Sequence, residues 1–148
     1  MVRAEDAEHI FSAGPSFAHG GRYNRRGEFG AVYFGESAKV CEQEKLRQVA
    51  GQADWLPPQM VGEVDADIHQ VVDLTNSKNL KTLGLTRDQL TDPMNLTLPQ
   101  ALAEAARHLG VRAMLVPSAV CEGKNLVVFE EHLLDPACRL KLAATRPW

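Results

Sequence analysis

The segment from His19 to Glu44 holds the densest set of side chains that could bind an anion or an aromatic ligand. Its sequence, HGGRYNRRGEFGAVYFGESAKVCEQE, contains three arginines and both tyrosines of the chain. Arg22 follows two glycines, and an arginine offers a planar fork of donors that suits phosphate oxygens. Adjacent glycines let a ligand approach the backbone closely. The segment therefore predicts a site for a ligand with anionic or aromatic parts.

Two further side chains extend this candidate site. Tyr33 supplies an aromatic face that can stack on a base or attract a cationic ring. Glu44 follows eleven residues later and falls between Val40 and Cys41 on a helical wheel, so it need not face solvent. An arginine fork, aromatic rings and a partly buried carboxylate together suit a nucleotide that bears a positively charged ring.

Each of these residues also has an ordinary structural interpretation. Arg22 could be a solvated residue in a turn, because most arginines are exposed. Tyr33 could be a core residue of an apolar strand, and Glu44 could pair with Arg47 on a helix surface. Arginines interleaved with aromatics also occur in proteins that bind single-stranded nucleic acid, but one such segment in an acidic chain disfavours that function.

Ser118 is a later candidate, in the stretch LVPSAVCEGKNLVVF. A serine at the end of a strand can donate a hydrogen bond to a phosphate or ribose oxygen. It does not resemble a catalytic serine nucleophile, because no glycine-flanked elbow surrounds it; an ordinary turn serine is the alternative. The five histidines are scattered without metal-ligand spacing, so we expect no metal.

Composition limits the class of protein. The chain has 148 residues, of which 45% are apolar and 24% charged, and this predicts one globular domain over residues 1–148. A net charge of −3 argues against a domain-wide basic surface for nucleic acid. The three cysteines form no disulfide framework, and neither a secretory signal nor an apolar membrane span is visible. We therefore expect a cytoplasmic protein without direct contact to membrane or nucleic acid.

The apolar pattern predicts an α+β fold with a mostly β core. Irregular structure is expected over the first thirty residues. One helix is expected over residues 37–50, capped by Ser37 and ended by the prolines of DWLPP. Strands are expected at 30–35, at 59–76 as one or two strands, and within 111–120, 125–131 and 138–144, with a loop and a short helix at 76–95.

The clearest helix is expected over residues 97–110. Thr97 and Gln100 have capping-box spacing, Pro99 lies in the first turn, and Gly110 follows the end. Helical spacing predicts an inner face made of Leu98, Leu102, Ala105 or Ala106, and Leu109.

Together these motifs resemble a known family. GGRYN, then AVYFGES, then a glutamate on the following helix, then VPSA and NLVVF resemble the RES domain, from Met1 to about Phe129. DLTN, after a strand, resembles the middle segment of the family. The resemblance implies a fold similar to ADP-ribosyltransferases, with a mostly antiparallel β core and flanking helices.

The resemblance also implies a function. RES domains degrade NAD by phosphorolysis or hydrolysis of the nicotinamide–ribose bond, with NAD as substrate, inorganic phosphate or water as acceptor, and no metal. One branch instead ADP-ribosylates a protein. Many members are toxins of type II toxin–antitoxin pairs, and their antitoxin carries a helix-turn-helix domain of the Xre type. The resemblance suggests a homodimer within such a complex.

The family residues map onto five positions of this sequence. Arg22, Tyr33, Glu44 and Ser118 match the motif arginine, the strand tyrosine, the acidic residue and the serine of the family. Arg3 lies close to the place of a first-strand arginine. The chain departs from the pattern there, because Val2 stands where an aromatic residue is usual and almost nothing precedes it.

The resemblance gives each matched residue an expected role. Glu44 would favour positive charge developing on the ribose, and its neighbour Glu42 is the alternative for this role. Tyr33 would stack against nicotinamide. Arg3 and Arg22 would clamp the pyrophosphate, and Ser118 would hydrogen-bond the nucleotide. The alternatives are a mono-ADP-ribosyltransferase that uses the same residues and a non-enzymatic module that binds a nucleotide or a partner.

Overall fold

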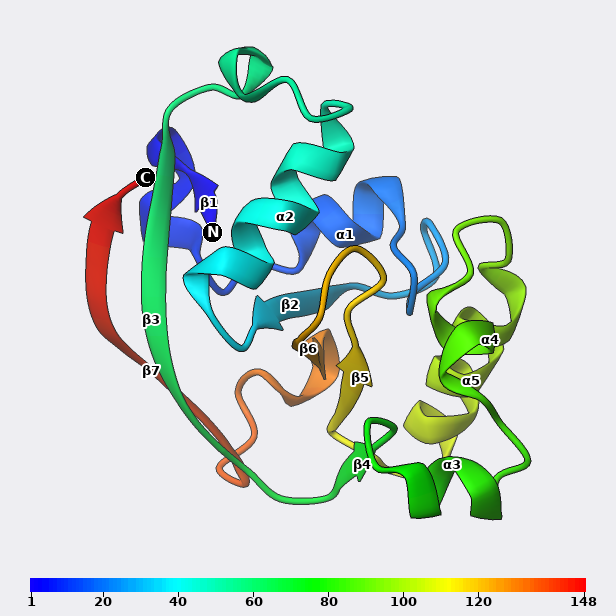
Figure 1. Cartoon of the computed structure of the whole chain (residues 1–148). Helices are drawn as coiled ribbons and strands as arrows, with labels where there is room; N and C mark the ends of the chain where they lie inside the picture. The colour runs from blue at the N-terminus through cyan, green and yellow to red at the C-terminus, as the bar shows by residue number, and fades with distance from the viewer.

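The computed structural model covers residues 1–148 and contains two β-sheets with helices packed beside them (Figure 1). The strands are β1 (Val2–Arg3), β2 (Ala31–Gly35), β3 (Gln59–Ile68), β4 (Val71–Asp73), β5 (Ala113–Pro117), β6 (Lys124–Phe129) and β7 (Cys138–Pro147). The α-helices are α1 (Gly14–His19), α2 (Ala38–Gln48), α3 (Ser77–Thr82), α4 (Arg87–Thr91) and α5 (Thr97–His108). Three short 3-10 helices complete the chain: η1 (Ala4–His9), η2 (Ala53–Trp55) and η3 (Glu130–His132).

The four-stranded sheet has the order β2-β6-β5-β4 and carries the candidate site. β6 pairs antiparallel with both β2 and β5, while β4 pairs parallel with β5. The central strand β6 ends in three fully buried residues, Val127, Val128 and Phe129. A short continuous apolar run is what a strand covered on both faces requires. This sheet brings residues from positions 31 to 129 into one layer.

The second sheet has the order β1-β3-β7 and lies to one side (Figure 1). β3 and β7 form a long curved antiparallel pair, with a register shift between Glu63 and Val64. Trp148 N donates to Gln59 O at 3.1 Å, so the C-terminus lies beside the start of β3. β1 pairs with the same end of β3, which brings both termini to one end of this sheet (Figure 1).

The predicted α+β class is confirmed, with antiparallel pairing predominant. Each predicted strand segment forms, and residues 59–76 contain two strands, β3 and β4. The first thirty residues are more ordered than expected, because they hold β1, η1 and α1. The predicted single short helix within 76–95 is two helices, α3 and α4, separated by Gly84 at φ 67°.

α2 begins as predicted but ends for another reason. The Ser37 side chain accepts a hydrogen bond from Val40 N and caps the helix. The helix ends at Gln48, well before the prolines of DWLPP. Ala50 and Gly51 follow with φ of 50° and 82°, so the chain leaves the helix through left-handed residues.

The predicted capping box and inner face of α5 are wrong in part. The N-cap is Leu96, which gives no side-chain cap, and Gln100 turns away to donate to Gly21 O at 3.0 Å. A complete capping box forms instead at α4, between Thr86 and Gln89. Leu109 is 83% exposed. The buried face is shifted by one residue from the predicted one and consists of Pro99, Ala103 and Ala106, with Leu102 half-buried.

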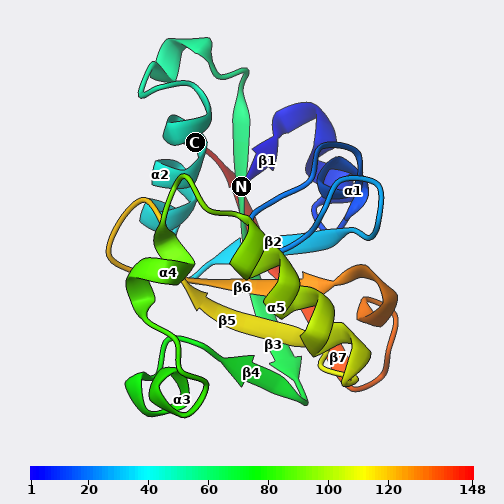
Figure 2. The same cartoon turned by 90° about the vertical axis from the view of Figure 1, so that its right-hand side faces the viewer.

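The main core lies between the four-stranded sheet and α4 and α5. Figure 2 shows α5 crossing the face of this sheet, with α3 and α4 next to it. Phe29 and Phe129 meet edge to face with ring centroids 5.9 Å apart, and Leu90 of α4 is fully buried in the same cluster. This packing fixes α4 against the segment that carries Arg22. No helix is long and apolar enough to cross a membrane.

Candidate functional site

The carboxylate of Glu44 is the centre of the candidate site. Glu44 lies on α2, and its Oε1 accepts hydrogen bonds from Ser118 Oγ and from Asn125 Nδ2, both at 2.9 Å. Ser118 directly follows β5 and is only 3% exposed, while Asn125 lies on β6. The structure thus brings together two of the predicted residues, 74 positions apart. Glu42 makes no corresponding contact, so the geometry favours Glu44 as the acidic residue.

Arg22 is held by backbone carbonyls rather than left free in solvent. Its Nη1 donates to Leu90 O at 3.2 Å and to Asp92 O at 2.9 Å, at the end of α4. Its Nε and Nη2 make no hydrogen bond with the protein. Partial burial lowers the pKa of Arg22, and Arg47 lowers it further, while Tyr23, Glu44 and Asp92 act in the opposite sense. Arg22 therefore lies within electrostatic reach of Glu44 and keeps donors for an anion.

Tyr33, on β2, holds the loop of Gly20, Gly21 and Arg22 in place through its hydroxyl. Its hydroxyl accepts from Tyr23 N at 3.0 Å and donates to Asn24 Oδ1 at 2.8 Å. Burial raises the pKa of Tyr33. A Cβ added at Gly21 would lie 2.6 Å from this hydroxyl, so the loop needs glycine there. Tyr33 thus has a structural role, as the alternative interpretation expected, although its hydrogen bonds to the loop were not foreseen. Its stacking on nicotinamide stays a prediction.

Tyr23 is the second tyrosine of the site, and its hydroxyl is unpaired. The side chain is 2% exposed, and the phenol oxygen is buried without a hydrogen-bond partner. Burial raises the pKa of Tyr23, Glu44 adds to this effect, and Arg22 opposes it. Buried hydroxyls without partners are uncommon in proteins, so the Tyr23 hydroxyl, next to Arg22, is an unusual feature of the site. Its place directly after the motif arginine was the only signal in the sequence.

Arg3 lies apart from this cluster. It is on β1, opposite Gln59 of β3, and its Nη1 pairs with Glu5 Oε1 at 3.3 Å. Its charge acts on Lys45 of α2, whose pKa is lowered first by burial and then by Arg3. No contact joins Arg3 to Arg22 or Glu44, so its role in clamping a pyrophosphate stays a prediction.

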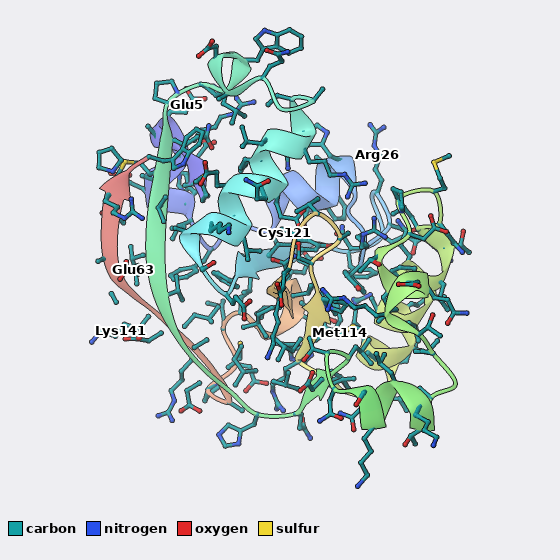
Figure 3. All side chains as sticks on the ribbon, viewed as in Figure 1. Glu5, Arg26, Glu63, Met114, Cys121 and Lys141 are labelled. Atoms are coloured by element: carbon teal, nitrogen blue, oxygen red, sulfur yellow. The ribbon has the colours of Figure 1, made fainter.

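Sequence reasoning missed Asn125. It was expected only as the first residue of a strand, whereas its amide donates from β6 to Glu44 on α2. The available signal was a polar residue at the start of the apolar run NLVVF. In the structure Asn125 lies opposite Val116 of β5, which is two residues before Ser118. Figure 3 shows Cys121 on the loop that joins β5 and β6, beside α2, and its Sγ lies 3.8 Å from Ser118 Oγ.

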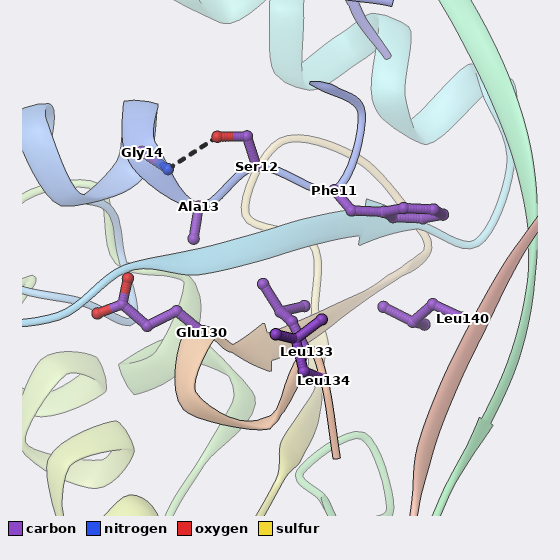
Figure 4. Close-up of a pocket in the computed structure, with 8 residues that line it drawn as sticks. All are labelled: Phe11, Ser12, Ala13, Gly14, Glu130, Leu133, Leu134 and Leu140. Atoms are coloured by element: carbon purple, nitrogen blue, oxygen red, sulfur yellow. Dashed lines mark hydrogen bonds between the residues drawn. The ribbon is translucent and has the colours of Figure 1, made fainter. Parts of the chain in front are cut away.

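Two surface pockets lie away from Glu44. The first, of about 590 Å³, lies between the segment before α1, η3 and β7, and is lined mainly by apolar side chains (Figure 4). The second, of about 350 Å³, is lined by Pro117, Gly123 and Lys124 among others, and neither Ser118 nor Glu44 lines it. No group of three or more His, Cys, Asp or Glu side chains could hold a metal ion.

The arrangement combines a fixed carboxylate with an arginine that has unused donors. A carboxylate whose orientation is set in advance can favour a positive charge that develops next to it. The arginine can bind a phosphate through its free donors. The site thus suits a ligand that carries a phosphate and develops positive charge as it reacts.

Comparisons with known proteins show the family and the fold of the chain. A search of curated proteins gave no match. Among solved structures, the fold is similar to a chain of the crystal structure of the M. tuberculosis MbcT–MbcA toxin–antitoxin complex, with a TM-score of 0.78 and 27% sequence identity, over 100% of this chain and 80% of that chain. A family model for the RES domain matches residues 2–144. Because that match covers nearly the whole sequence, the chain belongs to the RES domain family.

Proposed function

We propose that this protein is an enzyme that consumes NAD by cleaving the bond between nicotinamide and ribose. The observation that carries the proposal is the Glu44 carboxylate, held by Ser118 and Asn125 within electrostatic reach of the Arg22 guanidinium. Family membership supports the choice of NAD among nucleotides with a cationic ring.

The reaction needs a stabilised sugar cation. The C–N bond breaks, its electron pair leaves with nicotinamide as a neutral molecule, and positive charge moves to the ribose. Glu44 favours that charge and accepts a hydrogen bond from a ribose hydroxyl. An oxygen of water or inorganic phosphate then forms the new bond to the anomeric carbon, and water gives up a proton in doing so.

Arg22 orients the substrate. Its Nε and Nη2 bind the pyrophosphate, while the bonds from Nη1 to the carbonyls of Leu90 and Asp92 hold the guanidinium in place. This fixes the scissile bond next to Glu44. Tyr33 contributes an aromatic surface for nicotinamide, and Arg3 a second cation for the pyrophosphate.

We further propose that the protein is the toxin of a toxin–antitoxin pair. A solved structure with a similar fold is a chain of a toxin–antitoxin complex, and the match extends over the whole of this chain. The partner would be a protein antitoxin with a helix-turn-helix domain of the Xre type that covers or enters the active site, and the complex would contain a toxin homodimer. The enzyme would then act in the cytoplasm, where its substrate is abundant.

The test is nicotinamide release from NAD by the purified chain, with and without inorganic phosphate. We expect release by the wild type and a loss of about 100-fold or more in Glu44→Ala, because removing a group that stabilises the transition state costs on this order. Glu42→Ala is the matched control, since its carboxylate is two residues away on the same helix and makes none of these contacts; we expect it to keep its activity.

The products name the acceptor. ADP-ribose phosphate formed only with added phosphate would identify a phosphorylase, and free ADP-ribose a glycohydrolase. A labelled macromolecule would identify the alternative, a mono-ADP-ribosyltransferase. Folded protein that neither releases nicotinamide nor labels any macromolecule would contradict the proposal and leave a binding module.

A further inference from the structure

The donors around Glu44 are distributed unevenly over its two oxygens. Ser118 Oγ and Asn125 Nδ2 both donate to Oε1, at 2.9 Å each. Oε2 receives no hydrogen bond and forms no ion pair, and the surface pairing with Arg47 is not made. One oxygen is thus fixed by the protein, and the other is left for a ligand.

The Ser118 hydroxyl has no proton left to donate to a substrate. The hydroxyl donates a hydrogen bond to Glu44 Oε1. Its oxygen accepts a hydrogen bond from Val120 N at 3.3 Å and lies 3.8 Å from Cys121 Sγ. The serine backbone is fixed as well, because Ser118 N donates to Gly123 O at 2.9 Å. The side chain therefore acts through Glu44.

Asn125 is placed to act in the same way from a rigid element. It lies on β6, the strand between β2 and β5, opposite Gly35 on one side and Val116 on the other. A side chain on a central strand has little freedom to move, which suits a group that must hold a carboxylate to within a fraction of an ångström.

We infer that Asn125 is a positioning residue, which together with Ser118 holds Glu44 by Oε1 and presents Oε2 to the reacting sugar. This inference rests on the proposed function. It assigns Ser118 to the carboxylate instead of the nucleotide, and it adds to the reaction a residue outside the Arg, Tyr, Glu and Ser set.

The test is a double-mutant cycle between Asn125 and Glu44, in which the rate of nicotinamide release is measured for each variant. Asn125→Leu removes the donor without adding charge. We expect kcat to fall about 100-fold, the order found when a catalytic group is misplaced by about an ångström. KM for NAD should change by less than about threefold, because a residue that does not touch substrate leaves its binding intact.

The second arm of the cycle repeats Asn125→Leu in a Glu44→Gln background. There we expect a further change of less than about twofold, because residues that act as one unit are strongly non-additive. A purely structural loss of folded protein would lower both backgrounds by the same factor, so an equal loss overturns the inference. An increase in KM with kcat unchanged also overturns it, because Asn125 would then contact NAD.

Asn125→Asp is the second variant, should the leucine disturb the strand. It keeps the size of the side chain but sets a carboxylate next to Glu44, and we expect a loss at least as large. Asn76→Asp is the matched control, because Asn76 caps α3 through its oxygen, which aspartate keeps. A wild type that consumes no NAD refutes the proposed function itself, whereas an active wild type with an additive cycle refutes only the positioning role.

Discussion

At the scale of single residues, the two tyrosines of the site differ in what their hydroxyls do. The Tyr33 hydroxyl bridges Tyr23 N and Asn24 Oδ1, and so ties the loop that carries Arg22 to β2. The Tyr23 hydroxyl is buried without any partner. The Tyr33 hydroxyl thus stabilises the fold, whereas burying the Tyr23 hydroxyl without a partner costs stability.

Removing each hydroxyl separately tests this difference. Tyr33→Phe leaves a buried amide and a side-chain oxygen without their partner, and we expect it to lower the free energy of unfolding by about 1–3 kcal/mol. Tyr23→Phe removes an oxygen that bonds to nothing, so we expect a change within about 0.5 kcal/mol, or a gain. Urea unfolding of both variants decides between them, and equal losses would contradict the assignment.

The residue types of the site were predictable from sequence, but their contacts were not. Arg22, Glu44 and Ser118 stand in order along the chain, and the expected partial burial of Glu44 agrees with its hydrogen bonds to Ser118 and Asn125. The carbonyls that hold Arg22 could not be predicted, because they belong to residues 68 and 70 positions away. Such contacts depend on how α4 packs, and no local pattern encodes this.

At the scale of elements, the strands and long helices followed from local patterns, while the ends of helices did not. Apolar runs predicted the strands β2 to β7 but not β1, and Ser37 predicted the start of α2. α5 begins at Thr97 as predicted, but the predicted cap is wrong, because the Gln100 side chain donates to Gly21 O instead. In a capping box the Gln100 oxygen would accept from a nearby backbone N–H, whereas here its amide nitrogen donates to a distant carbonyl.

Two threonines with the same capping-box spacing provide a matched test. Thr86 forms the complete box at α4, whereas Thr97 caps nothing. We expect Thr86→Ala to lower the free energy of unfolding by about 1 kcal/mol, the usual cost of losing an N-cap. Thr97→Ala should change it by less than about 0.5 kcal/mol, as surface substitutions usually do. Thermal unfolding of the two variants measures both changes. A larger loss in Thr97→Ala than in Thr86→Ala would contradict this account and favour the capping box predicted at Thr97.

At the scale of the whole molecule, two aspartates link its stability to pH. Burial alone would raise the pKa of Asp73, but hydrogen bonds from Thr75 and the backbone of Asn76 outweigh it and lower the pKa. Asp135 accepts from Ala137 N and Arg112 Nε, and its pKa is lowered too. Both groups therefore favour the folded state when they are ionised.

The sign of the effect follows from these directions. A folded-state pKa below the unfolded value gives stability that is complete above the ordinary pKa of 3.8 and is lost as pH falls through the lower folded values. We expect the free energy of unfolding to decline below about pH 4. Asp135→Asn should have a lower free energy of unfolding than the wild type near neutrality and should lose less of it on acidification. Urea unfolding from pH 7 to pH 2.5 would measure both. An unchanged acid slope would contradict this account.

The strand order of the four-stranded sheet has a consequence for biosynthesis. β6 is the sixth strand made, yet it separates β2 from β5, so the sheet cannot close until residue 129 has left the ribosome. Arg22 and Glu44 emerge early, but Asn125 comes 81 residues after Glu44. A nascent chain ending before β6 therefore has no assembled site. At about 5–20 residues per second, translation provides a delay of several seconds between the first and last residues of the site, during which the site is incomplete.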